Sequence, residues 1–168
     1  MLVSPIGPRS TPRFGDGLGQ TDKVMLTLAR VPPVARLAMR SAIRDAREQP
    51  ERFLQTLRKD FSRSASDIRL LDEPGTAERV LTAFREATAQ GAGGCVSDWA
   101  LWGKKWSLDL QSGLTPTHIW HGDDDPLVPL HHAQHLHQLC PGSQLDVWSG
   151  EGHLHDDHAW REVLSALQ

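Results

Sequence analysis

The stretch from residue 116 onward constrains the fold most, because its hydrophobic period changes several times. Residues 117–121 follow a proline and form a short apolar run typical of a buried strand, and residues 144–148 alternate like a second strand. Residues 130–139, between them, have helical spacing. A last helix beginning at Asp156 or Asp157 carries the apolar residues Trp160, Val163, Leu164 and Leu167. This βαβα order predicts an α/β fold with parallel strands and crossover helices.

Each predicted strand is followed by a loop of unusual composition. The first loop reads Gly-Asp-Asp-Asp-Pro-Leu-Val-Pro over residues 122–129, and the second reads Gly-Glu-Gly-His over residues 150–153. Ligands and catalytic groups gather at the carboxyl ends of parallel strands. We therefore expect an acid from the first loop to meet His153. The acid would accept the imidazole Nδ1–H, which leaves Nε2 to act as a general base.

The first ninety residues differ from the rest of the chain in charge and composition. They hold 15 of the 18 Lys and Arg residues, whereas all nine His and all six Trp lie further along. Apolar residues at helical spacing predict helices that begin near Thr21 or Asp22, at Pro32, at Pro50, near Ser66 and after Pro74. A short helix is expected over residues 97–102. The arginines are interpreted as solvated helix faces, and we identify no residues for chemistry in this half.

Together, the two loops resemble the C-terminal part of the α/β-hydrolase superfamily, whose late acid loop typically reads G-x-x-D-x-x-V-P and whose final His commonly follows a turn of small residues. Matched by motif, the acid is Asp125 and the base is His153, 28 residues later. Asp123 and Asp124 are interpreted as turn formers, although either replaces Asp125 if the register of the loop shifts. The resemblance implies a Ser-His-Asp type hydrolase that acts on ester, amide or similar bonds, with no cofactor and no metal.

The resemblance also implies how the chain is divided. Residues 1–13 would be the end of a core strand and a linker, residues 14–105 a helical cap, and residues 106–168 the C-terminal part of the core. The superfamily carries its nucleophile on a G-x-S-x-G turn upstream of the acid, and this sequence contains no such motif. We therefore expect a partial, truncated α/β-hydrolase fold that lacks the N-terminal half bearing the nucleophile and is catalytically incomplete on its own.

Two other candidate sites compete with the Asp–His pair. Cys95, in Gly-Gly-Cys-Val-Ser, fits a nucleophile turn, but a helical pattern precedes it, and a small buried cysteine is the simpler interpretation. Residues 153–158 match H-x-H-x-D-H, the zinc signature of metallo-β-lactamase-like hydrolases, and give a zinc hydrolase as an alternative. His131, His135 and His137 do not converge on one helix face, so we expect this histidine-rich helix to be exposed.

Composition limits the remaining classes of function. A net charge of −3 argues against a charge-driven nucleic-acid binder, and no apolar run approaches the roughly 18–20 residues of a membrane helix. Two cysteines make no disulfide framework, which favours a cytoplasmic location. The expected partners are a small-molecule substrate and the missing N-terminal half. A non-catalytic truncated or split-protein half is the alternative function, because an Asp–His pair alone supplies only general-base chemistry.

Overall fold

The computed structural model describes residues 1–112 and 116–166, and Leu167 of the predicted last helix lies outside these ranges. Within them the chain forms three strands and eight helices: β1 (Leu2–Val3), α1 (Gln20–Leu28), α2 (Pro32–Glu48), α3 (Pro50–Phe61), α4 (Ala65–Asp72), α5 (Thr76–Ala87), α6 (Gly93–Trp102), β2 (His118–Gly122), α7 (His131–Leu139), β3 (Gln144–Trp148) and α8 (Asp157–Ser165). No helix of the described ranges has the length and apolar character needed to cross a bilayer.

The three strands form one parallel sheet with β2 at its centre. Leu2 of β1 lies opposite Ile119, and β2 pairs with β3 from His118 opposite Gln144 to Gly122 opposite Trp148. Helix α7 connects β2 to β3 and packs on the sheet through Ala133 and Leu136, which cluster with the buried Ile119. The predicted α/β class, with parallel strands in a βαβα order, is confirmed.

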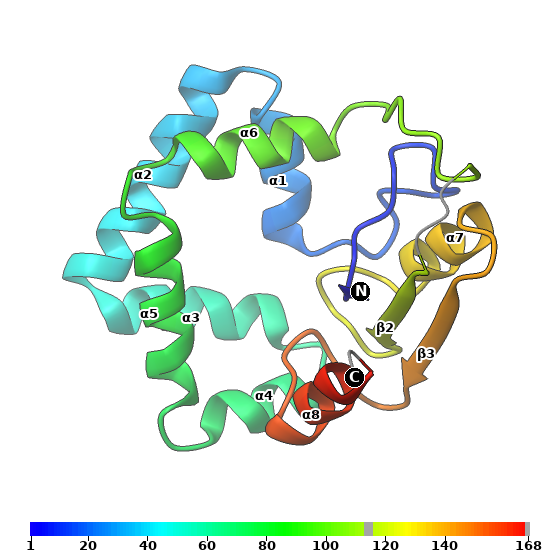
Figure 1. Cartoon of the computed structure of the whole chain (residues 1–168). Helices are drawn as coiled ribbons and strands as arrows, with labels where there is room; N and C mark the ends of the chain where they lie inside the picture. Colours follow the sequence, from blue (N-terminus) through cyan, green and yellow to red (C-terminus); the bar gives the residue numbers. More distant parts are fainter. Residues whose placement is uncertain (113–115, 167–168) are drawn as a thin grey trace.

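Residues 20–102, called here the helical segment, form the six helices between β1 and β2. Figure 1 shows α1, α2, α3, α5 and α6 on one side of the molecule and the sheet with α7 on the other, while α4 and α8 are drawn close to one another. The helical segment has its own apolar core, built from Met25, Ala35, Met39, Ile43, Ala92 and Val96. The sheet and the helical segment therefore each bury a separate set of apolar side chains.

Helices α2 and α3 begin at prolines, as predicted. Proline has no backbone N–H, and the N–H groups of the first helical turn have no intrahelical partner in any case, so proline removes no helical hydrogen bond there. Other predicted starts are wrong. Helix α4 begins at Ala65 because Ser64, and not Ser66, is its N-cap and accepts the N–H of Asp67. Helix α6 begins at Gly93 rather than at residue 97, since both glycines of its first turn adopt helical backbone. Gly19 is the N-cap residue of α1, which begins at Gln20.

Candidate active site

Asp125 is held rigidly in the loop that follows β2. One carboxylate oxygen, Oδ1, accepts the backbone N–H groups of Leu127 and Val128, each at 2.8 Å. Asp125 is 7% exposed, so the carboxylate is almost fully removed from water. Because Oδ1 is occupied by the loop's own backbone, the second oxygen, Oδ2, has a fixed direction.

His153 lies in the loop that follows β3, and its ring reaches Asp125. The imidazole Nδ1 and Asp125 Oδ2 are 2.8 Å apart, so the predicted contact between the two side chains is present. The backbone of the two loops also touches: a Cβ on Gly122 would overlap the carbonyl oxygens of Glu151 and Gly152. Glycine at the end of β2 therefore allows the His153 loop to pack against the acid loop.

The protonation of the two groups is coupled. Burial alone would raise the pKa of Asp125, but the hydrogen bond and positive charge of His153 outweigh it, and the pKa of Asp125 is lowered. Burial alone would lower the pKa of His153, but the hydrogen bond and charge of Asp125 raise it, with smaller contributions from Asp67 and Asp22. Both shifts favour a carboxylate–imidazolium pair, which is the arrangement that stabilises a protonated general base.

A third group, His121 on β2, adjoins the pair without joining it. Its Nε2 donates to the carbonyl oxygen of Val128 at 2.7 Å and lies 3.6 Å from Asp125 Oδ2. Burial lowers the pKa of this imidazole and so favours its neutral form. His121 thus holds the acid loop in place.

Side chains of the helical segment also act on the site, although its sequence indicated no residues for chemistry. Asp67 of α4 is fully buried and accepts the backbone N–H groups of His153 and Leu154. Burial raises the pKa of Asp22, in α1, to about 7, although the charge of His153 opposes this shift. The charge of the site therefore depends on pH near neutrality. The only sequence signal for Asp67 is a Ser-x-x-Asp spacing, which is typical of a helix start.

Ser4 and His155 form a further contact that the sequence did not predict. Ser4 follows β1 with a φ of 45°, and its Oγ lies 3.0 Å from His155 Nε2. Burial lowers the pKa of His155 to about 4, so this imidazole is neutral at physiological pH. The pair connects the end of the first strand to the residues just after His153.

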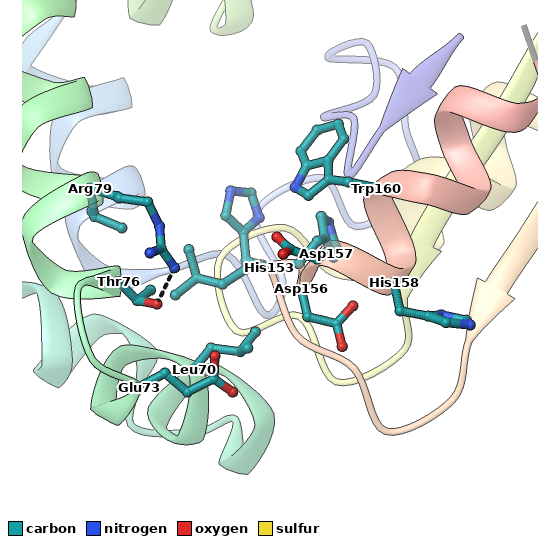
Figure 2. Close-up of a pocket in the computed structure, with 12 residues that line it drawn as sticks. Leu70, Glu73, Thr76, Arg79, His153, Asp156, Asp157, His158 and Trp160 are labelled. Carbon is teal, nitrogen blue, oxygen red and sulfur yellow. Dashed lines mark hydrogen bonds between the residues drawn. The ribbon is translucent and has the colours of Figure 1, made fainter.

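A pocket of about 620 Å³ opens beside His153. Figure 2 shows His153 with Thr76 and Arg79 of α5 on one side and Trp160 of α8 on the other. The His153 side chain is 32% exposed, so solvent reaches the imidazole despite its contact with the buried acid. The wall is mixed: Leu70, Val80 and Leu154 are apolar, while Glu73, Arg79, Asp156 and Asp157 carry both signs of charge.

The zinc alternative receives no geometric support. Across residues 1–112 and 116–166, no three His, Cys, Asp or Glu side chains are grouped so that they could hold a metal ion. His153 faces Asp125, and His155 faces Ser4. The first two histidines of the H-x-H-x-D-H pattern are therefore used in separate contacts.

Asp123 and Asp124, which the sequence offered as turn formers, link the two loops. Asp123 accepts the N–H of Gly150, and Asp124 donates its own N–H to the carbonyl of Glu151. Cys95 is partly buried in α6, packed on the core of the helical segment. The expectation of surface histidines over residues 131–137 is wrong for His132, which is fully buried and bridges Gly7 N to Phe14 O.

A second histidine–carboxylate contact occurs at the opposite end of the same strand. His118, the first residue of β2, lies 2.5 Å from Asp146 of β3, and the Asp146 side chain is 53% exposed. This pair has no loop backbone bonded to its carboxylate among the described contacts, and it is separated from His153 by the length of the strand. It serves as a natural control for experiments on Asp125 and His153.

The chain is similar to a small number of known proteins over part of their length. No family model matches it. Uncharacterized proteins of Mycobacterium tuberculosis and Mycobacterium bovis are 37% identical over 90 residues, which cover 48% of this chain and 26% of each relative. Among solved structures, an esterase from Rhodococcus sp. has a TM-score of 0.49 at 23% identity, and an esterase from Exiguobacterium antarcticum has 0.47 at 18%. They match 82% and 79% of this chain, which spans about half the length of these esterase chains (50% and 46%).

Proposed function

We propose that this chain supplies the acid–base pair of an α/β-hydrolase-type hydrolase acting on ester, amide or similar bonds of small molecules. The observation that carries the proposal is the 2.8 Å contact between Asp125 Oδ2 and His153 Nδ1 at the carboxyl ends of two adjacent parallel strands. A carboxylate fixed by two backbone N–H groups orients an imidazole that solvent still reaches, as a general base requires. In this proposal the helical segment is the cap over the pocket.

The chemistry of the pair follows from its tautomer. When His153 is neutral, Asp125 accepts its Nδ1–H and Nε2 carries the free lone pair. In the complete site, Nε2 removes the proton of a nucleophile as its oxygen attacks the carbonyl carbon, and the resulting imidazolium returns that proton to the leaving group. Asp125 stays ionised throughout and stabilises the imidazolium. In the proposal the nucleophile of the complete site comes from a separate N-terminal half, whereas in the isolated chain a water activated directly by His153 takes its place.

The test is hydrolysis of an activated ester, p-nitrophenyl acetate, by the purified chain. We expect turnover above the buffer rate, and we expect His153→Ala to reduce it by about 100-fold, the contribution typical of a positioned general base. His118→Ala is the matched control, because His118 also contacts a carboxylate but lies at the other end of β2. Equal rates for the parent chain and His153→Ala would contradict the proposed function, as would the absence of any turnover.

A further inference from the structure

The buried carboxylate of Asp67 takes no part in the chemistry described above, although it contacts the loop that carries the base. Asp67 lies in the first turn of α4 and is 0% exposed. Its Oδ2 accepts the backbone N–H of His153 at 3.1 Å, and its Oδ1 accepts the N–H of Leu154 at 2.7 Å. One side chain of the helical segment thus binds two consecutive amides of a loop 86 and 87 residues away in sequence.

Such an arrangement requires a carboxylate and not merely a polar residue. Two successive backbone N–H groups form a concave donor site that suits an anion, and each carboxylate oxygen serves one donor. A fully buried Asp is uncommon because the charged form loses its hydration, and burial does raise the pKa of Asp67. The hydrogen bonds from His153 and Leu154 and the charge of His153 oppose that effect.

The loop residue before the base is shaped to this contact. Gly152 is buried, and a Cβ at this position would overlap all three carboxylate atoms of Asp67. Only glycine therefore lets the carboxylate approach the N–H groups of the next two residues. The small-residue turn before His153 has a specific use here: it makes room for an acid from the helical segment.

We propose that Asp67 is a positioning residue for the base: its carboxylate fixes the backbone of residues 152–154 so that the His153 ring faces Asp125. The statement that this ring is a base rests on the proposed function, whereas the fixing of the loop does not. His153 is then held from two directions, through Nδ1 by the acid loop and through its backbone by α4. Because Asp67 belongs to the helical segment, any displacement of α4 is transmitted directly to the base.

The charges around His153 determine what the loss of Asp67 does to its titration. The groups that act on its protonation are the carboxyls of Asp125, Asp67 and Asp22, which raise the pKa of His153. The imidazoles of His121 and His155 interact with His153 as well, and burial lowers the pKa of both, which favours their neutral forms. Removing the Asp67 charge therefore lowers the pKa of His153 directly, and displacement of the ring from Asp125 lowers that pKa further.

The experiment compares Asp67→Asn with Asp72→Asn by NMR on the intact chain. An asparagine keeps one acceptor oxygen but turns an NH₂ group toward a second donor, so one of the two bonds is lost. We expect the amide protons of His153 and Leu154 to exchange with solvent at least about tenfold faster in Asp67→Asn. We also expect the pKa of His153 to fall. Asp72 lies at the other end of α4, exposed and paired with Arg58, so its variant leaves both quantities unchanged.

A second measurement uses the parent chain alone, so it does not depend on whether Asp67→Asn folds. Through-hydrogen-bond couplings from the amide nitrogens of residues 153 and 154 to the Asp67 carboxylate carbon report the two bonds directly. Detectable couplings support the proposal, and undetectable ones in a folded chain overturn it, as does unchanged amide exchange together with an unchanged His153 pKa in Asp67→Asn. These outcomes can be distinguished from a failure of the proposed function. If His153→Ala does not change the rate of hydrolysis, His153 is not the general base, but the NMR result on the loop still stands.

Discussion

Asp125→Ala is expected to lower the free energy of unfolding by about 3 kcal/mol at pH 5, because the substitution leaves several buried donors without an acceptor. The carboxylate accepts the N–H groups of Leu127 and Val128 and faces His153 Nδ1, all at 2.8 Å. An alanine cannot replace any of these bonds, and water has little access to the site of a side chain that is buried. Urea denaturation of the parent and variant chains measures the difference.

The stabilising effect of Asp125 is expected to depend on pH with a definite sign. The pKa of Asp125 is lowered from 3.8, so its contribution is present above that value and is lost as the pH falls through the folded-state pKa. The pKa of His153 is raised from 6.5, so its contribution is complete below 6.5 and is lost as the pH rises through the folded-state pKa. The parent and Asp125→Ala chains should therefore differ most between pH 3.8 and 6.5.

Asp146→Ala is the control for this substitution. Asp146 also contacts an imidazole, but its side chain is half exposed, so its removal is expected to cost less than about 1 kcal/mol. A difference between the parent and Asp125→Ala chains no larger than that of Asp146→Ala, or one that is constant from about pH 5 to about pH 9, would contradict the charged pair.

Gly122→Ala is expected to destabilise the chain by a similar amount, about 3 kcal/mol, for a steric reason. A Cβ at the end of β2 would overlap the backbone of Glu151 and Gly152, and backbone cannot move aside as a flexible side chain does. Relief of the overlap requires the His153 loop to move away from the acid loop. We therefore expect lower stability by urea denaturation and a His153 pKa that returns toward its ordinary value.

Gly94→Ala tests whether this loss is specific to Gly122. Gly94 lies in the first turn of α6, and a Cβ there meets nothing within 4 Å. Alanine is also the better helix former, so the free energy of unfolding should change by at most about 1 kcal/mol, in the stabilising direction. If the two alanine variants are equally stable, the close approach of the two loops is refuted.

Local pattern was enough to predict the elements that bring the pair together. The strands around Ile119 and Leu145, the intervening helix and the two loops all follow from hydrophobic period and from turn residues close in sequence. Once parallel strands are expected, their carboxyl ends place Asp125 near His153 without further information. The contact is therefore a consequence of topology.

The contribution of the helical segment could not be predicted in the same way. Asp67 and Asp22 lie on amphipathic helices where an acid ordinarily faces water, and the residues within one turn of each indicate at most the start of a helix. Their burial depends on how α1 and α4 pack against a loop far along the chain, which is a tertiary property. His132 illustrates the same point, because its partners, Gly7 and Phe14, come from a loop more than a hundred residues away.

The titration of His153 in the intact chain tests the central claim most directly. In NMR spectra of the imidazole carbons and protons, His153 should titrate above 6.5, the ordinary value for the side chain. Asp125→Asn keeps the shape of the side chain but not its charge, and it should lower the His153 pKa, whereas Asp146→Asn should leave it unchanged. A His153 that titrates at or below 6.5 in the parent chain, or that responds equally to both variants, would show that Asp125 does not hold the imidazole.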